Sequence, residues 1–257
     1  MSDAVLSSAD AIALQAEGVS RYFGGLKAVE GVSLTLRRGE LHAVIGTNGA
    51  GKSTLINLLS GELPPSAGRV ILNGQEVTDW SQPRRARAGL GRSYQRNTVF
   101  LEFTVRENCR LAAQARWQRA WDWWTPAKRC AKAQAAAEDA LARAGLRAVA
   151  ERTAGTLSHG QKRQLEIAMC LASDPQVLLL DEPLAGMGPE ETERMLALLG
   201  QLKTGHAILL VEHDMDAVFR VADRITVMVN GRVIASDLPD AIRQHREVRI
   251  AYLGDGH

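Results

Sequence analysis

The stretch GTNGAGKS, residues 46–53, decides which fold the chain can adopt. It fits the pattern G-x-x-x-x-G-K-[S/T] and stands between LHAVIG, an apolar run typical of a strand, and KSTLINLLSGEL, whose apolar residues recur at helical spacing until Gly61. In that context the glycines let backbone N–H groups turn toward phosphate oxygens, and the helix N-terminus adds the positive end of its dipole. We therefore expect a phosphate-binding loop rather than an ordinary glycine-rich turn. The predicted nucleotide contacts come from Gly46, Thr47, Asn48, Gly49, Ala50, Gly51, Lys52, Ser53 and Thr54.

Further apolar runs extend this unit into a sheet. VLLLDE and AILLVEH are typical of strands buried on both faces, and the helical stretch between them starts at Pro189 and ends at Gly205. Such a strand-helix-strand unit indicates a parallel pair of strands. AVEGVSLTLRRGE alternates like a strand with one exposed face. Asn73-Gly74 and Asn230-Gly231 predict two hairpins, so part of the β structure is antiparallel.

Strand signals disappear between about residues 98 and 172, where helix formers dominate. Thr104 with Glu107 forms a capping box that opens one helix, and KRCAKAQAAAEDALARAGL predicts a second helix that closes at Gly145. The predicted fold is α/β: a phosphate-loop nucleotide-binding core with a mainly parallel sheet, an antiparallel β subdomain and an inserted helical subdomain. Within a single domain of residues 1–257, the core is expected at about 12–97 and 173–240, the helical subdomain at about 98–172, and a C-terminal tail at 241–257.

Five side chains in these segments carry chemistry. Lys52 is expected to reach the β- and γ-phosphates of a nucleotide, and Ser53 to bind magnesium. At the end of VLLLDE, Asp181 can hold the magnesium shell and Glu182 can orient and deprotonate an attacking water. His213 follows the next strand, at a position suited to meet the γ-phosphate, although a purely structural histidine is the alternative. Together these residues indicate phosphoryl transfer.

LSHGQKRQLE, residues 157–166, combines a helix cap with a possible anion site. Ser158 and Gln161 form a capping box that heads an amphipathic helix. A capped helix start with a hydroxyl and the glycine at position 160 also suits an anion. The two interpretations are compatible, so this motif alone does not decide between them.

Composition excludes several classes of protein. The 31 basic and 29 acidic residues give a formal charge of +2, so no long-range field indicates nucleic acid as a partner. Three cysteines without C-x-x-C spacing fit a reducing compartment and no structural metal. The sequence has no secretory signal and no apolar run long enough to cross a membrane, so any membrane role is expected to be peripheral.

Five sequence motifs occur in an order that resembles that of a known protein family. The phosphate loop, Gln95, LSHGQ, VLLLDE and the histidine of EHD follow one another at separations that resemble the ATPase subunit of ATP-binding-cassette (ABC) transporters, over nearly the whole chain. The resemblance implies the α/β core with a helical subdomain, with ATP and Mg²⁺ as its ligands. It also implies that two such domains meet head to tail, with each ATP between one chain's phosphate loop and the other's signature sequence.

The resemblance assigns roles residue by residue. Ser158, Gly160 and Gln161 would act on the ATP held by the partner chain. Gln95 would ligate magnesium, sense the γ-phosphate and link it to the membrane subunits, while Glu182 and His213 would be the catalytic base and the switch histidine. The aromatic residue that stacks on adenine would be Phe23, with Tyr22 as the neighbouring candidate.

Finer features resemble the branched-chain amino-acid importer branch. YFGGLKAVEGVSL, LEIAMCLASDP, DEPLAGMGPEET and the tail IAYLG carry this likeness. It implies a second similar ATPase, giving a homo- or heterodimer, two membrane permeases and a periplasmic substrate-binding protein, with the chain held peripherally at the cytoplasmic face of the inner membrane. Near relatives in this branch handle urea, short amides and some aromatic acids, which are the alternative substrates. Phe100 and Phe103 are the candidates for contact with a permease.

Three features depart from the family pattern or stand outside it. Gly188 lies where the family's D-loop usually ends in aspartate, and His159 stands where a glycine is common, although this branch admits Tyr or His there. Trp117, Trp121 and Trp124 fall on one helical face, which favours packing within the helical subdomain over a surface near permeases or lipid headgroups.

Two other classes of function are alternatives. A soluble cassette ATPase that remodels a macromolecule would usually carry two cassettes or a long coiled-coil insertion, and this sequence has neither. A regulatory module that binds a nucleotide without turnover would not need Glu182 and His213.

Overall fold

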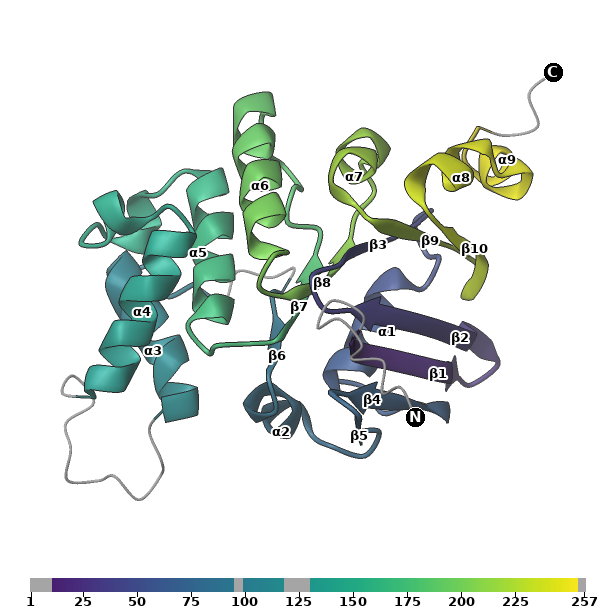
Figure 1. The fold of residues 1–257 in the computed structure, drawn as a ribbon, viewed down its shortest axis with the longest axis horizontal. Coiled ribbons are helices and arrows are strands. Elements are labelled where there is room, and N and C mark those ends of the chain that lie inside the picture. Colours follow the sequence, from purple (N-terminus) through teal and green to yellow (C-terminus); the bar gives the residue numbers. More distant parts are fainter. Residues whose placement is uncertain (1–10, 95–98, 118–129, 254–257) are drawn as a thin grey trace, which may run out of the picture.

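The computed structural model describes residues 11–94, 99–117 and 130–253, and its framework is a six-stranded sheet (Figure 1). The strand order is β10-β9-β3-β8-β7-β6, and every neighbouring pair is parallel except β9 and β10. All residues of β3, β7 and β8 are buried, as expected for parallel strands covered on both faces. The strands are β3 (Leu41–Gly46), β6 (Leu90–Arg92), β7 (Val177–Asp181), β8 (Ala207–Val211), β9 (Arg224–Val229) and β10 (Arg232–Asp237).

A second, antiparallel sheet lies below the first in Figure 1, with α1 (Lys52–Ser60) between them. Its strand order is β2-β1-β4-β5. Leu55, Ile56, Leu58 and Leu59 of α1 are completely buried in a hydrophobic cluster that contains residues of both sheets. Burial of each such side chain contributes roughly 1.5–3 kcal/mol, so this packing fixes the helix that follows the phosphate loop. The strands are β1 (Ile12–Phe23), β2 (Leu26–Arg37), β4 (Ala67–Leu72) and β5 (Gln75–Glu76).

Helices cover the other face of the six-stranded sheet (Figure 1). Met195 and Leu199 of α6 share a hydrophobic cluster with Leu178 of β7, and Val218 of α7 shares a cluster with Ile225 of β9. β3 and β7 both run parallel to β8, so the loops that follow them begin at the same edge of the sheet. Among the described residues, the helices outside the helical part are α1 and also α2 (Gln82–Arg87), α6 (Pro189–Leu202), α7 (Met215–Val221), α8 (Pro239–Gln244) and α9 (Arg246–Leu253).

The helical part lies at the β6–β7 end of the sheet, on the left in Figure 1. It consists of α3 (Val105–Trp117), α4 (Ala131–Arg143), α5 (His159–Leu171) and two short 3₁₀ helices at Arg147–Val149 and Ala154–Thr156. Cys109 and Leu141 share one hydrophobic cluster with Leu180 and Leu210 of the sheet. The helical part is therefore packed onto the core rather than built around a core of its own. The boundaries of 98–172, 12–97, 173–240 and 241–257 stay predictions.

Local signals in the sequence are confirmed where a glycine is needed. Gly61 adopts φ 80° and ends α1. In both predicted hairpins the Asn-Gly pair has positive φ at both residues, at Asn73-Gly74 between β4 and β5 and at Asn230-Gly231 between β9 and β10. The helix that starts at Pro189 ends at Leu202 rather than at Gly205, because residues 203–205 form a turn in which the Gly205 N–H bonds the Leu202 carbonyl.

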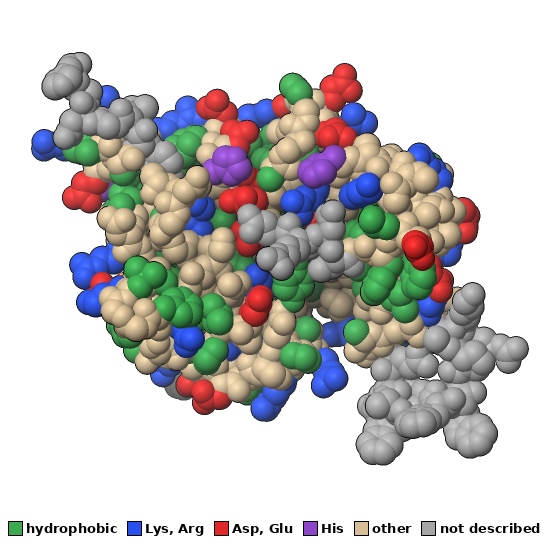
Figure 2. Space-filling view, turned by 180° about the vertical axis from the view of Figure 1, so that it is seen from behind, with side chains coloured by type: hydrophobic (Ala, Val, Ile, Leu, Met, Phe, Trp, Pro, Cys, Tyr) green, Lys and Arg blue, Asp and Glu red, His purple; other side chains and the backbone are tan. Residues whose placement is uncertain are grey.

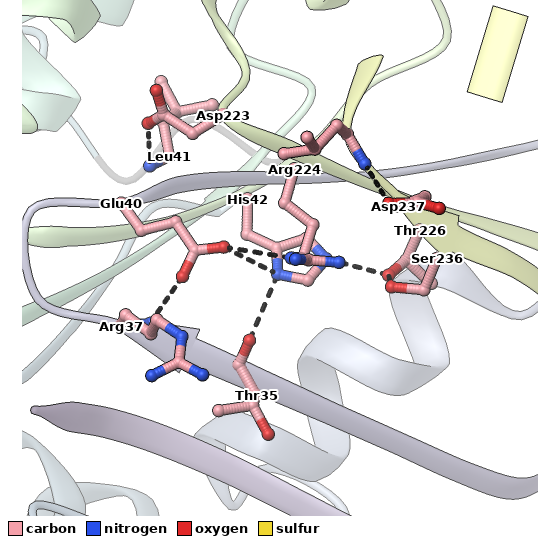
Figure 3. A network of polar contacts seen from close by, with 11 residues as sticks. Thr35, Arg37, Glu40, Leu41, His42, Asp223, Arg224, Thr226, Ser236 and Asp237 are labelled. Carbon is pink, nitrogen blue, oxygen red and sulfur yellow. Dashed lines mark hydrogen bonds and ion pairs between the residues drawn. The ribbon is translucent and has the colours of Figure 1, made fainter. Parts of the chain in front are cut away.

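A buried polar network joins β2 to the six-stranded sheet (Figure 3). The His42 ring is 1% exposed; its Nδ1 lies 3.2 Å from the Thr35 carbonyl oxygen and its Nε2 lies 2.8 Å from Thr226 Oγ1. Thr226 Oγ1 in turn lies 2.7 Å from Ser236 Oγ. The Glu40 carboxylate approaches Nδ1 at 3.6 Å. Burial lowers the pKa of His42 to about 4, so the ring is neutral at physiological pH.

Candidate nucleotide-hydrolysing site

The loop between β3 and α1 has a shape that only glycine permits at two positions. A Cβ atom at Gly46 would lie 2.4 Å from the Met228 carbonyl oxygen, and one at Gly51 would lie 2.3 Å from that of Ala28. Gly51 also has φ 96°, in the left-handed region, and directly precedes α1. The loop is thus seated between β2 and the end of β9, with the start of α1 directed into it.

Lys52 is buried at the centre of this loop. Its ammonium donates to the carbonyl oxygens of Gly46 at 2.7 Å and Thr47 at 3.1 Å. Burial lowers the pKa of Lys52, and the nearby charges of Glu182 and Asp181 act in the opposite direction. The ammonium is therefore held over the loop by weak neutral acceptors, which phosphate oxygens can replace with charged ones.

Asp181 ends β7 and is 3% exposed. Its Oδ1 is buried and has no hydrogen-bond partner among the described residues. Burial, and then the charge of Glu182, raise the pKa of Asp181. An unpaired buried carboxylate oxygen suits a cation, and Mg²⁺ needs only one or two protein ligands beside substrate phosphates and water. Among the described residues there is no group of three or more His, Cys, Asp or Glu that could hold a metal ion.

Glu182 has an uncommon backbone conformation, with φ 49°. The left-handed region costs a non-glycine residue roughly 1–2 kcal/mol, and the bond from the Glu182 N–H to the Val211 carbonyl at 2.9 Å helps to hold it. The turn directs the side chain into the cavity over the phosphate loop. His213 Nδ1 lies 3.9 Å from Glu182 Oε1, so the predicted base and switch histidine are neighbours.

Glu212 is a functional candidate that the sequence analysis missed. Its carboxylate is completely buried and accepts hydrogen bonds from the Leu184 N–H at 2.8 Å and the His213 N–H at 3.2 Å. Burial is the main cause that raises its pKa. The carboxylate thereby ties the segment after Glu182 to the segment that carries His213. The sequence feature that could have identified Glu212 is its position directly after the wholly apolar strand Ala207–Val211.

A cavity of about 570 Å³ opens over the phosphate loop. Phe23 borders it, whereas Tyr22 does not, so the position favours Phe23 as the aromatic that meets a base. The Arg21 guanidinium lies 4.8 Å from the Phe23 ring centroid. Asp181 is not among the described residues that line the cavity. The lining consists of Phe23, Leu26, Lys27, Ala28, Asn48, Gly49, Ala50, Gly51, Lys52, Ser53, Thr54, Glu182 and Asn230.

The signature stretch begins α5, and its capping box is confirmed. Ser158 Oγ accepts from the Gln161 N–H, and Gln161 Oε1 accepts from the Ser158 N–H, both at 3.2 Å. The His159 ring lies beside Gly186, where a Cβ atom would be 3.3 Å from its Cε1. A separate cavity of about 260 Å³ opens at this helix start, and it shares no described lining residue with the cavity over the phosphate loop. In one chain, therefore, the two motifs border different cavities.

For several other predicted residues the structure gives only limited information. Gln95, Trp121 and Trp124 lie outside the described residues. Trp117 packs against the hydrophobic cluster that the helical part shares with the sheet, as the packing interpretation expects for this residue. Gly188 precedes α6 and has no side chain with which to cap it.

Charges of both signs are interspersed with histidines on the face shown in Figure 2, so no single sign of charge dominates that side.

The fold and the cavity over the phosphate loop are those of a nucleotide-binding α/β domain, and comparison with known proteins defines the family. Residues 29–185 match the model described as ABC transporter, and residues 232–257 match the one described as branched-chain amino acid ATP-binding cassette transporter. The chain belongs to the ABC transporter family and is an ATP-hydrolysing cassette. The resemblance seen in the sequence is thereby confirmed.

Similar proteins agree over almost the full length. The high-affinity branched-chain amino acid transport ATP-binding protein BraF of Pseudomonas aeruginosa is 40% identical over 250 residues, which cover 94% of this chain and 98% of BraF. LivG of Escherichia coli strain K12, with the same description, is 39% identical over 249 residues, which cover 94% of this chain and 98% of LivG.

Solved structures support the fold. A nucleotide-free ATP-binding cassette from an ABC transporter has a TM-score of 0.85 at 29% identity and covers 95% of this chain and all of that chain. The ADP conformation of MJ1267, an ATP-binding cassette of an ABC transporter, has a TM-score of 0.85 at 30% identity and covers 95% of this chain and 99% of that chain. The predicted α/β class is therefore confirmed.

Proposed function

We propose that the chain is the ATP-hydrolysing subunit of an importer for branched-chain or related amino acids. The observation that supports hydrolysis most directly is the position of Glu182, which borders the same cavity as Lys52 and Ser53 of the phosphate loop. Amino-acid import is supported by the 40% and 39% identity to BraF and LivG and by the family match of residues 232–257.

The residues of the cavity suggest a division of labour. The loop N–H groups and the Lys52 ammonium bind the phosphates of ATP, and Phe23 meets the adenine. Mg²⁺, held by Ser53, Asp181 and Gln95, would neutralise charge on the β- and γ-phosphates. Glu182 orients a water and accepts its proton, and His213, 3.9 Å away, contacts the γ-phosphate. The raised pKa of Asp181 reflects unsatisfied burial, which a bound cation would relieve.

Two cassettes would complete one another. Ser158, Gly160 and Gln161 border a cavity distinct from that over the phosphate loop, which suits an action on the ATP of a second cassette. That second cassette is an identical or a similar chain. Binding of ATP closes the dimer, and hydrolysis opens it again.

The remaining partners are two membrane permeases and a periplasmic substrate-binding protein, and the chain is held peripherally at the cytoplasmic face of the inner membrane. Among the described residues no helix is both long and apolar enough to cross a membrane. Phe100 and Phe103 are 54% and 42% exposed and stack with ring centroids 5.5 Å apart, and they follow Gln95 closely in the sequence. An exposed aromatic pair of this kind suits a docked permease helix.

The test is purification of the complex from cells that express the chain with its permeases, followed by ATPase measurements with loaded binding protein. We expect leucine, isoleucine or valine to stimulate ATP hydrolysis. Stimulation by urea, short amides or aromatic acids instead would keep the ATPase role and replace the substrate. Failure to co-purify with any permease would contradict the importer assignment.

A further inference from the structure

The Glu191 carboxylate lies on the start of α5, where the signature sequence would meet a phosphate. Its Oε1 accepts hydrogen bonds from the Ser158 hydroxyl at 2.9 Å and from the Gly160 N–H at 3.2 Å. It also accepts one from the Gly188 N–H. The bond from Ser158 is the main cause that lowers the pKa of Glu191, so the carboxylate is charged at neutral pH. The donors of the signature sequence are thus occupied by an anion of the chain itself.

The position of Glu191 explains how it reaches these donors. Glu191 is the third residue of α6, and Ser158 directly precedes α5, so one carboxylate bonds at the starts of two helices. Both helix starts carry the positive end of a dipole, which favours a negative charge between them. Gly188 offers no capping side chain to α6, but the Glu191 carboxylate accepts from the Gly188 N–H, which is the bond that the third residue of a helix makes in a capping box.

The carboxylate and a phosphate would compete for the same atoms. Ser158 Oγ already accepts from the Gln161 N–H, and its single hydroxyl hydrogen can be given to only one acceptor at a time. A Cβ atom at Gly160 would lie 2.6 Å from Glu191 Cδ, so the carboxylate fills the space directly against the Gly160 backbone. A γ-phosphate from a second cassette therefore requires the departure of Glu191.

We propose that Glu191 is a placeholder for the phosphate: in the separate cassette its carboxylate occupies the donors of Ser158 and Gly160, and it releases them when a second cassette brings its ATP. When Glu191 releases Ser158 and Gly160, its carboxylate can keep the bond to the Gly188 N–H, because that bond lies within the start of α6. Glu191 thereby raises the ATP concentration at which two cassettes close. This inference rests on the proposed function, since it assumes an ATP shared between two cassettes.

The test is the Glu191→Gln substitution in the purified complex with its permeases. Glutamine keeps the shape and one acceptor oxygen but removes the charge that competes with phosphate. We expect the KM for ATP to fall roughly fivefold, while kcat stays within about twofold. The KM falls because the apparent affinity for ATP is reduced by the fraction of cassettes in which Glu191 occupies the donors, and the substitution removes that fraction. The isolated chain in the Glu182→Gln background, followed by sedimentation with Mg-ATP, is expected to dimerise at lower protein concentration.

Glu190→Gln is the matched control. It removes the same charge from the same first turn of α6, but the Glu190 side chain is 92% exposed and contacts Arg194 at 3.4 Å rather than the start of α5. We expect its KM and kcat to equal those of the unmodified complex.

The outcomes separate a placeholder from a residue that only caps α6. A structural role predicts a lower melting temperature with an unchanged or higher KM for ATP, and that result would overturn the inference. A complex in which the unmodified chain does not hydrolyse ATP at all would overturn the proposed function, and the placeholder with it. A fall in KM that Glu190→Gln reproduces would also overturn the inference, because it would reflect the charge of α6 rather than the contact with Ser158 and Gly160.

Discussion

At the scale of single residues, the site depends on side chains whose backbone is held in an uncommon conformation or whose polar atoms lack partners. Glu182 adopts φ 49°, and Asp181 Oδ1 is buried without a hydrogen-bond partner among the described residues. Both arrangements cost stability unless a ligand compensates for them. Locally unfavourable features of this kind are typical of functional sites, where a bound ligand compensates for them. This is the physical reason why we propose Glu182 as the catalytic base and Asp181 as a ligand of the cation.

Glu182→Gln is expected to separate binding from hydrolysis. Glutamine preserves the size of the side chain, so ATP binding measured with a fluorescent analogue should stay within about twofold. Loss of the base should slow phosphate release by at least ~100-fold. Glu193→Gln, which alters a surface pair with Arg220, serves as the control. Turnover near the unmodified rate would remove Glu182 from the role of base.

Positions 158 and 159 are expected to respond in opposite ways. Ser158→Arg removes the hydroxyl and places a long side chain at the start of α5, so ATPase activity of the complex should be lost. His159→Gly should leave activity largely intact, because the ring lies beside Gly186 and is not one of the donors at the helix start. The measurement is ATP turnover of both variants at matched complex concentration. If the glycine variant alone were inactive, His159 would have a role of its own.

At the scale of elements, signals within about ten residues predicted the structure well. Gly61, Pro189 and the two Asn-Gly turns define local backbone conformations that few other residues provide, so their elements could be predicted from the sequence. Contacts between distant segments could not be predicted. Glu212 bonds Leu184 across 28 positions and Glu191 bonds Ser158 across 33, and only the packing of neighbouring strands and helices brings these pairs together.

Short elements at the edges were also beyond the sequence signals. The edge strand β6 has three residues, and α9 lies in a stretch predicted only as a tail. Three residues are too few to show an alternation of apolar and polar side chains. Their structure comes from a neighbour, as in the parallel pairing of β6 with β7.

The network that ties β2 to the six-stranded sheet predicts a pH dependence of stability. His42 has a pKa of about 4 in the fold, against 6.5 for an ordinary histidine in an unfolded chain, so the unfolded chain binds its proton first as the pH falls. This contribution to stability is present above pH 6.5 and is lost between pH 6.5 and about 4, to a total of roughly 3 kcal/mol. Glu40, whose pKa is raised chiefly by burial, contributes in the opposite direction just above pH 4.5. The positive charge of Arg224 adds to the lowering of the His42 pKa.

The contribution of His42 can be isolated by a difference. Melting temperatures of the unmodified chain and of a His42→Gln variant, measured from pH 8 to pH 5, share the effects of Glu40 and of His206, whose pKa is also lowered by burial. We expect the unmodified chain to lose more stability than the variant on acidification. Parallel curves would show that His42 does not titrate between folded and unfolded states.

At the scale of the whole molecule, the helical part and the sheet share one hydrophobic cluster, so a displacement of one is transmitted to the other through packed side chains. Phe100 is tied to the helical part, because Asn108 of α3 bonds both its N–H and its carbonyl, and the Phe103 ring stacks on that of Phe100. A helix pressed against these rings would therefore act on α3 directly and, through the shared cluster, on the strand that ends at Asp181. This arrangement suits an exchange of force between a permease and the site of hydrolysis.

A Phe100→Ser, Phe103→Ser double variant tests that coupling. Both rings are exposed, so the fold should be kept, and ATP binding by the isolated chain should equal that of the unmodified chain. We expect co-purification with the permeases to fall and stimulation of ATPase activity by substrate to disappear, because the apolar contact is lost. Leu238→Ser removes an equally exposed apolar side chain, 57% exposed at the start of α8, and should change neither property. A double variant that still assembles and is stimulated would move the permease contact elsewhere on the molecule.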